Sequence, residues 1–426
     1  MSTVRHILTG KRIVIAIYAL AVALRLLAVV VYVDTDPQTA NLWEYGQEAK
    51  NFIQHGTVSY VYFEGTDNEF IAPSSLMPPG LVLLWIALFK AFGISRLALT
   101  AMLILNLILG VLIVHLTYRI AQLVTKNEKV ALITLIIISF YPTFVYAVST
   151  YHALNAYLAL FLLSVYLLFL SADNPKLLYI AALGIIAGLM PLFRANFLIY
   201  AALIGICILW LSKSLKKLLL YASLALLVIA PWTIRNYIVF GDVIVSANSL
   251  GYNFWRGHND FTKGSGETDT AYPIPPHITQ KINALPRDKT FEKARDKIFL
   301  AEVLHSIRAN PLRELSLVPR KLLLFWLFEV YDEHITHRLS YVIPHFLTLL
   351  FFILGLAFAA DTIKLPYRRL FYLVFFIETL VCVAFFVLTR YRMTIEPFLF
   401  IFSAAGMNAV LERLPHARLA QAAHTN

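Results

Sequence analysis

Long uninterrupted apolar segments recur along the chain. Residues 13–33, 130–148 and 370–388 each come close to or exceed the ~20 residues that an α-helix needs to cross a bilayer. A soluble core does not need so many runs of this length, so the pattern predicts an all-α polytopic membrane protein. About ten transmembrane helices are expected, over residues 12–33, 97–118, 129–148, 153–171, 177–192, 195–212, 217–234, 342–360, 368–389 and 394–412.

Two shorter apolar segments are predicted to lie in the membrane interface. Segment 78–93 opens with Pro78-Pro79 and then offers only about twelve residues, interrupted by Lys90, which is too short for a span. The run LLLFWLF at 322–328 is also too short. Both segments suit helices that lie along the membrane surface.

Short basic loops set the predicted orientation. If segment 78–93 does not cross, every short loop rich in Lys and Arg falls on the side of the N-terminus, which the positive-inside rule places in the cytoplasm. Two large extracytoplasmic loops remain, 34–96 and 235–341. The chain then divides into an N-terminal membrane module (1–234) that includes the first loop, the second loop (235–341), and C-terminal membrane helices (342–426).

The second large loop contains an amphipathic pattern. Phe291, Ala294, Ile298, Ala301 and Leu304 recur at helical spacing, with charged residues between them. This spacing predicts a helix that packs on the membrane domain.

Composition supports the membrane assignment. Of 426 residues, 59% are hydrophobic and 14% charged, and the mean hydropathy is +0.70, far from the values of soluble domains. The net charge of +11 is spread among spans and one long loop instead of forming an aromatic-interleaved basic patch. We therefore expect membrane lipids as partners and no nucleic acid. Cys207 and Cys382 fall within predicted spans and are expected to be packing residues.

Ionisable residues gather on the predicted outer side. The carboxylates Asp34, Asp36 and Glu44 begin the first loop. Such residues at the ends of apolar helices either anchor at the interface or face a cavity. The basic residues on the same side are His152, Arg194, Arg235, Arg390 and Arg392.

Carboxylates facing several arginines suit sugar transfer from a lipid-linked phosphate. Guanidinium groups bind phosphate oxygens in bidentate fashion and stabilise the negative charge that grows on the leaving group. A glycoside hydrolase normally needs two carboxylates, one as acid and one as base. A transferase with a phosphate leaving group needs only one, to deprotonate the acceptor hydroxyl.

Each of these residues also has a purely structural interpretation. Glu44 could pair with Lys50 on one helix, and Asp34 and Asp36 could form a turn that caps the next helix. Arg390 and Arg392 could snorkel to the headgroups, and His152 could be a hydrogen-bonded helix-end residue. The sequence contains no zinc-ligand spacing, no glycine-rich phosphate loop and no nucleophile elbow.

Three stretches carry a resemblance to a known family: WEYGQEAKNF at 43–52, APWTIRNY at 230–237 and LTRYRMTIEP at 388–397. Together with the intervening pattern they make nearly the whole chain similar to bacterial GT-C membrane glycosyltransferases of the protein O-mannosyltransferase/glycosyltransferase 39-like superfamily. The resemblance implies a multi-spanning enzyme whose first extracytoplasmic loop carries the catalytic carboxylate. It also implies inverting transfer from a polyprenyl-phosphate-linked sugar donor to an acceptor on the outer side.

The resemblance assigns roles to individual residues. Glu44 falls where one bacterial subgroup has a glutamate in a W-E-x-G setting, which implies the general base, and Tyr45 beside it joins the substrate-binding residues. Better known branches have an acidic residue where this chain has Asn41, so Asp34 and Asp36 remain rival bases. The P-W-x-x-R-N and R-Y-R-x-x-x-x-P motifs fall on Pro231, Trp232, Arg235 and Asn236, and on Arg390, Tyr391, Arg392 and Pro397.

One departure concerns metal binding. Members of the family often have an acidic residue near the start of the fourth span, where this chain has Tyr151-His152. Whether the protein uses a divalent metal as a cofactor therefore stays an open question, because the sequence shows no clear set of ligands for one.

The sequence thus predicts a polyprenyl-phosphate-sugar-dependent glycosyltransferase of the bacterial plasma membrane. Its site would face outward, with Glu44 as base and with Arg194, Arg390, Arg392 and Arg235 around the donor phosphate. The acceptor could be a lipid, a glycan or a protein, and neither the sugar nor the oligomeric state follows from the sequence. A lipid or solute transporter is the alternative, although inverted repeats and glycine-broken spans are absent from the sequence. A non-catalytic scaffold is a third.

Overall fold

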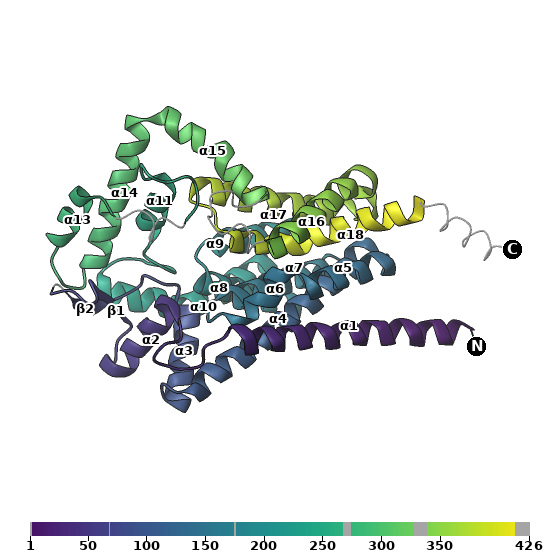
Figure 1. Cartoon of the computed structure of the whole chain (residues 1–426), viewed down its shortest axis with the longest axis horizontal. Coiled ribbons are helices and arrows are strands. Elements are labelled where there is room, and N and C mark those ends of the chain that lie inside the picture. The colour runs from purple at the N-terminus through teal and green to yellow at the C-terminus, as the bar shows by residue number, and fades with distance from the viewer. Residues whose placement is uncertain (1, 68, 174–175, 267–273, 328–338, 414–426) are drawn as a thin grey trace.

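The computed structural model describes residues 2–67, 69–173, 176–266, 274–327 and 339–413, with the side chains of 2–10 and 173 left undescribed. In this part of the chain the structure is almost entirely helical, and the single sheet consists of β1 (Ser59–Tyr62) and β2 (Phe70–Pro73). The start of α1 (Ser2–Tyr32) and the end of α18 (Glu396–Arg413) lie at one end of an elongated molecule (Figure 1). The predicted module 342–426 runs past Arg413 into residues outside this description.

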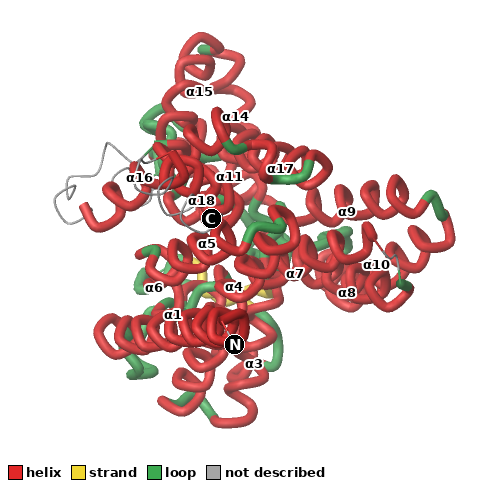
Figure 2. The backbone as a smooth tube through the Cα atoms, turned by 90° about the vertical axis from the view of Figure 1, so that its right-hand side faces the viewer, coloured by secondary structure: helices red, strands yellow, loops and turns green. Residues whose placement is uncertain are grey.

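A bundle of long apolar helices forms one half of the molecule. Its helices are α1 (Ser2–Tyr32), α4 (Arg96–Thr125), α5 (Glu128–Phe140), α6 (Pro142–Tyr146), α7 (Leu154–Asp173), α8 (Leu177–Phe193), α9 (Phe197–Ser212), α10 (Leu215–Phe240), α16 (Leu339–Phe358), α17 (Leu365–Ala384) and α18 (Glu396–Arg413). Three 3₁₀ helices connect them: η1 (Ala147–Ser149), η3 (Ala360–Thr362) and η4 (Thr389–Thr394). In Figure 2, α8, α9 and α10 stand together at one side of the bundle.

The shorter helices lie toward the other end. They are α2 (Trp43–His55), α3 (Pro79–Phe92), α11 (Leu250–His258), α13 (Pro276–Asn283), α14 (Phe291–Ala309) and α15 (Pro311–Trp326). We call α2, β1, β2, α11, α13 and α14 together the loop lobe.

Apolar helices coincide with all ten predicted spans, but fewer meet a strict criterion for crossing. By length and composition five described helices can span a membrane: α1 from Lys11, α4, α7 to Ala172, α10 and α16. Counting α5 with the bent segment after it, at an angle of 55°, gives six. The protein is therefore a multi-pass membrane protein, and the number of about ten crossings stays a prediction.

Small residues bring neighbouring helices of the bundle together. A Cβ atom on Gly188 of α8 would lie 2.6 Å from the carbonyl oxygen of Ala225 in α10. In the same way, Gly355 of α16 and Gly406 of α18 face each other's backbone. Close backbone approach at small residues is a common way for helices to associate within a bilayer.

One buried arginine supports the break between α5 and α6. Arg25 of α1 is fully buried and donates hydrogen bonds to the carbonyl oxygens of Ser139 at 3.0 Å and Ile138 at 3.4 Å. These carbonyls belong to the last turn of α5, just before Pro142, where the hydrogen bonding within the helix is interrupted. The sequence analysis treated 12–33 as a plain apolar span and did not anticipate this contact.

The loop lobe has its own aromatic core, which includes Tyr62, Trp255, Phe291, Phe299 and Val303. Helix α10 continues past the predicted boundary at residue 235 to Phe240 and ends at Gly241 in the left-handed conformation. One expectation needs correction here. Helix α14 buries Phe291, Phe299 and Val303 within the lobe, whereas Ala301 and Leu304 of the predicted apolar stripe are exposed.

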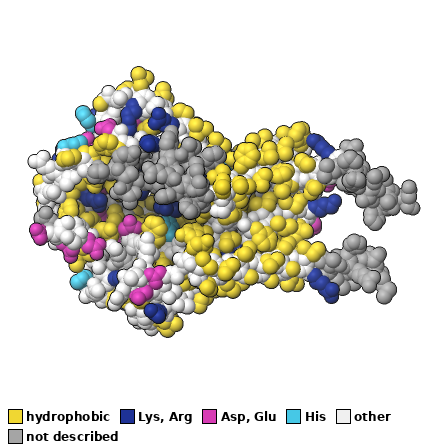
Figure 3. Space-filling model, in the orientation of Figure 1, with side chains coloured by type: hydrophobic (Ala, Val, Ile, Leu, Met, Phe, Trp, Pro, Cys, Tyr) yellow, Lys and Arg dark blue, Asp and Glu magenta, His cyan; other side chains and the backbone are white. Residues whose placement is uncertain are grey.

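Charged side chains are unevenly distributed over the molecule. Apolar side chains cover the bundle, and Lys and Arg side chains gather at the end where α18 ends (Figure 3). Both acidic and basic side chains mark the loop-lobe end of the same view. A basic end beside the termini is what the positive-inside rule expects of a cytoplasmic N-terminus.

Candidate active site

The first turn of α2 is set by a local side-chain contact. Asn41 accepts a hydrogen bond from the Trp43 backbone N–H at 3.0 Å, and Trp43 has a φ of 56°, in the left-handed region. Gly46 lies against Leu42, where any Cβ atom would clash. This tight entry places Trp43, Glu44 and Tyr45 at the start of the helix.

An aromatic cluster joins α2 to two other parts of the chain. The His152 ring lies edge-on to Trp43 and Tyr45, with ring centroids 5.3 and 5.7 Å apart. The guanidinium carbon of Arg390 lies 5.5 Å from the centroid of the Trp43 ring. Residues of α2, of the turn before α7 and of η4 therefore meet at one place.

Arg194 reaches the same place from the end of α8. Its guanidinium donates to the Tyr157 hydroxyl at 3.1 Å and lies 4.5 Å from the ring centroid of Tyr391. The Arg390 guanidinium lies 5.8 Å from the centroid of that same ring. Two arginines 196 positions apart in sequence thus share one aromatic contact, close to Trp43.

Several buried polar atoms at this site lack a partner. Within the described part of the chain, His152 Nδ1, Arg390 Nε and both amide atoms of Asn196 are shielded from solvent and make no hydrogen bond. Asn196 belongs to the turn that carries Arg194. Since leaving such groups unpaired is costly, the arrangement fits the binding of a polar ligand.

His152 is a neutral residue of this cluster. Burial lowers its pKa to about 3, and the charges of Arg390 and Arg194 act in the same direction. A neutral imidazole between two arginines can donate or accept a hydrogen bond without adding a third positive charge.

Glu44 is half-buried beside this cluster. It makes no hydrogen bond or ion pair with any described residue, and Lys50 instead donates to the carbonyl oxygen of Pro37 at 2.9 Å. Burial raises the pKa of the neighbouring Tyr45 above its ordinary value, and the Glu44 charge adds to that shift. Glu44 is therefore an unengaged carboxylate that lies in sequence between Trp43 and Tyr45, two rings of the aromatic cluster.

Asp34 and Asp36 are engaged in a turn. Asp34 accepts hydrogen bonds from the Asp36 N–H at 2.8 Å and from the Thr39 hydroxyl, and these bonds lower the pKa of Asp34. Asp36 accepts from the Gln38 N–H at 2.9 Å and lies 3.9 Å from the guanidinium of Arg96. Their local geometry matches the turn interpretation of these two residues.

Arg235 and Arg392 do not join Arg194 and Arg390. Arg235 donates to the carbonyl oxygens of Ser74 at 2.8 Å and Val58 at 2.9 Å. Two other residues of its motif also bind main-chain carbonyls: the Trp232 indole N–H donates to Ser246, and the Asn236 side-chain amide donates to Ile244. The P-W-x-x-R-N motif thus fastens the first loop and the start of the second loop to α10.

Arg392 has a similar bracing role. It pairs with Glu396 at 3.1 Å and donates to the carbonyl oxygens of Phe325 at 3.2 Å and Leu327 at 2.9 Å, at the end of α15. It is buried, and its guanidinium is occupied by these partners. Of the four arginines that the sequence suggested, two meet at the candidate site.

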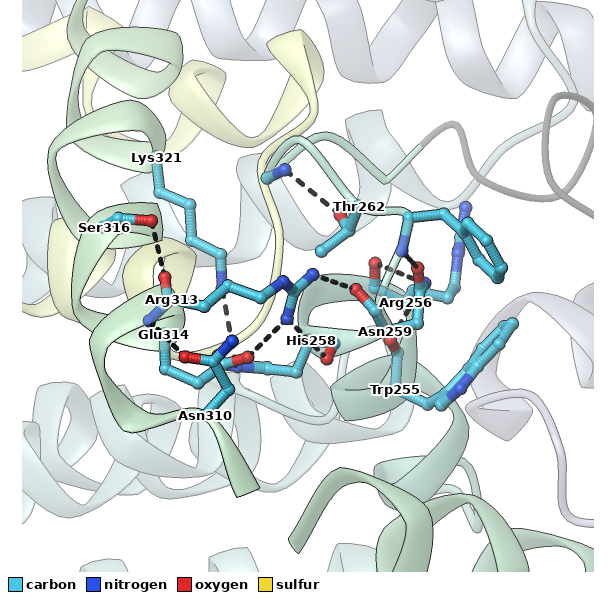
Figure 4. A network of polar contacts seen from close by, with 12 residues as sticks. Trp255, Arg256, His258, Asn259, Thr262, Asn310, Arg313, Glu314, Ser316 and Lys321 are labelled. Atoms are coloured by element: carbon cyan, nitrogen blue, oxygen red, sulfur yellow. Dashed lines mark hydrogen bonds and ion pairs between the residues drawn. The ribbon is translucent and has the colours of Figure 1, made fainter. Parts of the chain in front are cut away.

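Polar residues of α11 and α15, which include His258, Glu314 and Lys321 (Figure 4), support the segment that leads to Arg390. Lys321 of α15 donates to the carbonyl oxygens of Val383 at 3.0 Å and Phe385 at 2.6 Å. His258 of α11 contacts the carbonyl of Ala384 at 2.8 Å and the carboxylate of Glu314 at 2.6 Å. Basic side chains therefore satisfy the free carbonyls at the end of α17.

The strand-like segment after α17 is held in turn by the segment that follows α11. The Val387 N–H donates to the Gly264 carbonyl and the Gly266 N–H donates to the Val387 carbonyl, both at 3.0 Å. Arg390 follows three residues later. Sequence reasoning missed these contacts, because nothing local in the sequence pairs 258–266 or Lys321 with 383–387.

The described residues offer no clear set of metal ligands. Among the described residues no three His, Cys, Asp or Glu side chains lie together in a way that could hold a metal ion.

Comparison with known proteins is informative at the level of fold. No family model matches the sequence, and no curated protein is similar to it. Archaeal oligosaccharyltransferase AglB from Archaeoglobus fulgidus, in complex with an inhibitory peptide and a dolichol-phosphate, has a TM-score of 0.53 and 13% identity, over 97% of this chain and 52% of that one. The apo form of an Archaeoglobus fulgidus oligosaccharyltransferase has a TM-score of 0.54 and 14% identity, again over 97% of this chain and 52% of that one.

ArnT from Cupriavidus metallidurans bound to undecaprenyl phosphate is also similar, with a TM-score of 0.41 and 13% identity, over 93% of this chain and 77% of that one. The chain spans about half the length of the oligosaccharyltransferases it matches. The expected fold is confirmed: over almost its whole length the chain has the same helical GT-C fold as these oligosaccharyltransferases.

Proposed function

We propose that the protein is an integral membrane glycosyltransferase that transfers a sugar from a polyprenyl-phosphate-linked donor to an acceptor hydroxyl. The observation that carries the proposal is the meeting of Arg194 and Arg390 at the Tyr391 ring, beside the helix turn that carries Glu44. Fold similarity to oligosaccharyltransferases supports the same reaction class.

Arg194 and Arg390 are the proposed donor-phosphate ligands. Two guanidinium groups offer several donors in fixed planes, which matches the oxygens of a phosphate. Arg390 Nε has no partner among the described residues and is shielded from water, so a bound phosphate would satisfy it. His152 and Asn196 then remain to contact the phosphate or the sugar. The AglB complex, of the same fold, holds a dolichol-phosphate, which is a lipid of this chemical class.

Glu44 is the proposed general base. Its carboxylate takes the proton of the acceptor hydroxyl, whose oxygen attacks the anomeric carbon from the face opposite the phosphate. The bond between that carbon and the phosphate oxygen breaks, and polyprenyl phosphate leaves with the electron pair, stabilised by Arg194 and Arg390. One displacement inverts the anomeric centre and leaves the proton on Glu44. Asp34 and Asp36 are less suited, because their oxygens already accept hydrogen bonds in the turn.

The proposed location of this chemistry is the extracytoplasmic face of a bacterial plasma membrane. The loop lobe and the candidate site lie at the end of the bundle opposite the basic terminal end, which fits a cytoplasmic N-terminus (Figures 1 and 3). The acceptor is proposed to be a lipid, a glycan or a protein exposed on that face.

Glu44→Gln tests the base assignment. We expect the variant to release polyprenyl phosphate from a sugar-charged lipid more slowly by on the order of 10²–10⁴-fold, the usual contribution of a general base, while its affinity for the donor stays near wild type. Glu64→Gln, at an exposed carboxylate of the same loop, is the matched control and should keep wild-type turnover.

Two results would contradict the proposal. An active Glu44→Gln together with an inactive Asp34→Asn or Asp36→Asn moves the base to the turn. Movement of the intact sugar-charged lipid across the bilayer, without release of polyprenyl phosphate, favours a transporter instead.

A further inference from the structure

Two buried carboxyl groups meet where α2 contacts α14. Glu48 of α2 is 0% exposed and Glu292 of α14 is 3% exposed. The Ser74 hydroxyl oxygen lies between them, 2.7 Å from Glu48 Oε1 and 2.8 Å from Glu292 Oε2. This contact joins the first loop to the second across 218 positions of sequence, one helical turn from Glu44.

The hydrogen-bond partners identify Glu292 as the ionised member of the pair. Its carboxylate accepts from the Ser75 N–H at 3.0 Å, the Ser75 hydroxyl at 2.8 Å and the Tyr62 hydroxyl at 2.8 Å. Three donors around one carboxylate stabilise its charged form. Glu48 has fewer donors, the Ser74 hydroxyl and the Met77 backbone N–H, and its Oε2 is buried without any hydrogen-bond partner among the described residues.

A single hydroxyl proton cannot serve both carboxylates. If Ser74 donates its proton to Glu292, its oxygen is left facing Glu48 Oε1 at 2.7 Å as an acceptor, so Glu48 has to supply the proton of that contact. The neutral acid then donates to Ser74 and Ser74 donates to the Glu292 carboxylate. In this arrangement both short oxygen–oxygen contacts, Glu48 to Ser74 and Ser74 to Glu292, are hydrogen bonds with one proton each.

The surrounding charges agree with this assignment. Arg235 of α10 is the nearby cation, but its guanidinium is directed to the carbonyls of Ser74 and Val58 and to the side chain of Asn236. Burial raises the pKa of Glu48 to about 8. The Ser74 hydrogen bond, the Met77 backbone hydrogen bond and Arg235 oppose this shift, and the Glu292 charge adds to it.

We propose that Glu48 is a neutral carboxylic acid that positions the start of α2, and with it Glu44, by sharing its proton through Ser74 with the Glu292 carboxylate. Glu48 is too deeply buried to contact the acceptor, so it is a positioning residue. Its effect on turnover rests on the proposed role of Glu44. Loss of its proton would place two negative charges around one hydroxyl and weaken the contact of α2 with α14.

The test compares Glu48→Gln, which mimics the neutral acid, with Glu48→Ala and Glu292→Gln. Turnover of a synthetic polyprenyl-phosphate sugar is measured from about pH 6 to pH 10, with Glu64→Gln as control. Near pH 7 we expect Glu48→Gln to stay within about twofold of wild type, and the other two variants to lose about tenfold or more, as for a buried polar group left unpaired. Above about pH 8 wild-type turnover should fall, and that of Glu48→Gln should not.

Thermal unfolding in detergent gives a second readout that does not depend on the reaction. The folded protein keeps a proton on Glu48 that the unfolded chain has lost, so between about pH 5 and pH 8 wild type should lose stability relative to Glu48→Gln. Superimposable pH profiles of wild type and Glu48→Gln, or a Glu48→Gln variant as damaged as Glu48→Ala, would overturn the inference. If neither wild type nor any variant turns over the donor, but wild type still loses stability relative to Glu48→Gln as the pH rises, the proposed function has failed and the assignment of a neutral Glu48 has not.

Discussion

At the scale of single residues, the arginines of this protein divide into two kinds by their partners. Arg194 and Arg390 stack on aromatic rings and retain donors for a ligand, whereas Arg235 and Arg392 are occupied by main-chain carbonyls. The sequence analysis placed all four around the donor phosphate, since motif positions say nothing about which carbonyl a side chain meets. Only the folded chain separates the two proposed phosphate ligands from the two arginines that hold main chain.

This division predicts different defects at Arg390 and Arg392. Arg390→Gln should lower turnover by roughly 10²–10³-fold, as for loss of a group that stabilises transition-state charge, with the unfolding temperature nearly unchanged. Arg392→Gln should lower the free energy of unfolding by about 3–5 kcal/mol, because Glu396 becomes a buried, unpaired carboxylate. Turnover assays and thermal unfolding of both variants check this. Equal loss of stability in the two variants would contradict the division.

At the scale of elements, apolar periodicity was sufficient for the helices and insufficient for their connections. Each predicted span corresponds to an apolar helix, because runs of this length have no other stable conformation in a bilayer. The β1–β2 hairpin was not predicted, since its four-residue strands lie in a polar loop without clear alternation. The stripe predicted for 291–304 was wrong in part, because α14 packs on α11 in the loop lobe and buries Phe299 and Val303 instead.

The support for the end of α17 can be tested at Lys321. Lys321→Met removes the donor for the carbonyls of Val383 and Phe385, so the segment leading to Arg390 should loosen. We expect a lower unfolding temperature and about tenfold slower turnover, as for buried carbonyls left unpaired. Arg320→Met, at the exposed neighbouring position of α15, is the control. Identical behaviour of the two variants would show that the network does not position Arg390.

At the scale of the whole molecule, the account depends on bringing distant segments together at one end of the bundle. Residues 43–45, 152, 194 and 390–391 come from four separate parts of the chain and converge through ring contacts on Trp43, His152 and Tyr391. The sequence could suggest that these groups share a side of the membrane, because loop charges set orientation. It could not establish their convergence, which depends on helix packing at residues such as Gly188 and Gly355.

The most direct test of this account measures which leaflet supplies the substrate. Protein is reconstituted in one orientation into liposomes, and a synthetic polyprenyl-phosphate sugar is confined to one leaflet at a time, with release of polyprenyl phosphate as the signal. The account predicts release when the donor is in the leaflet on the side of the loop lobe, and loss of that release in Glu44→Gln. Release from the opposite leaflet only, or undiminished release by Glu44→Gln, would contradict it.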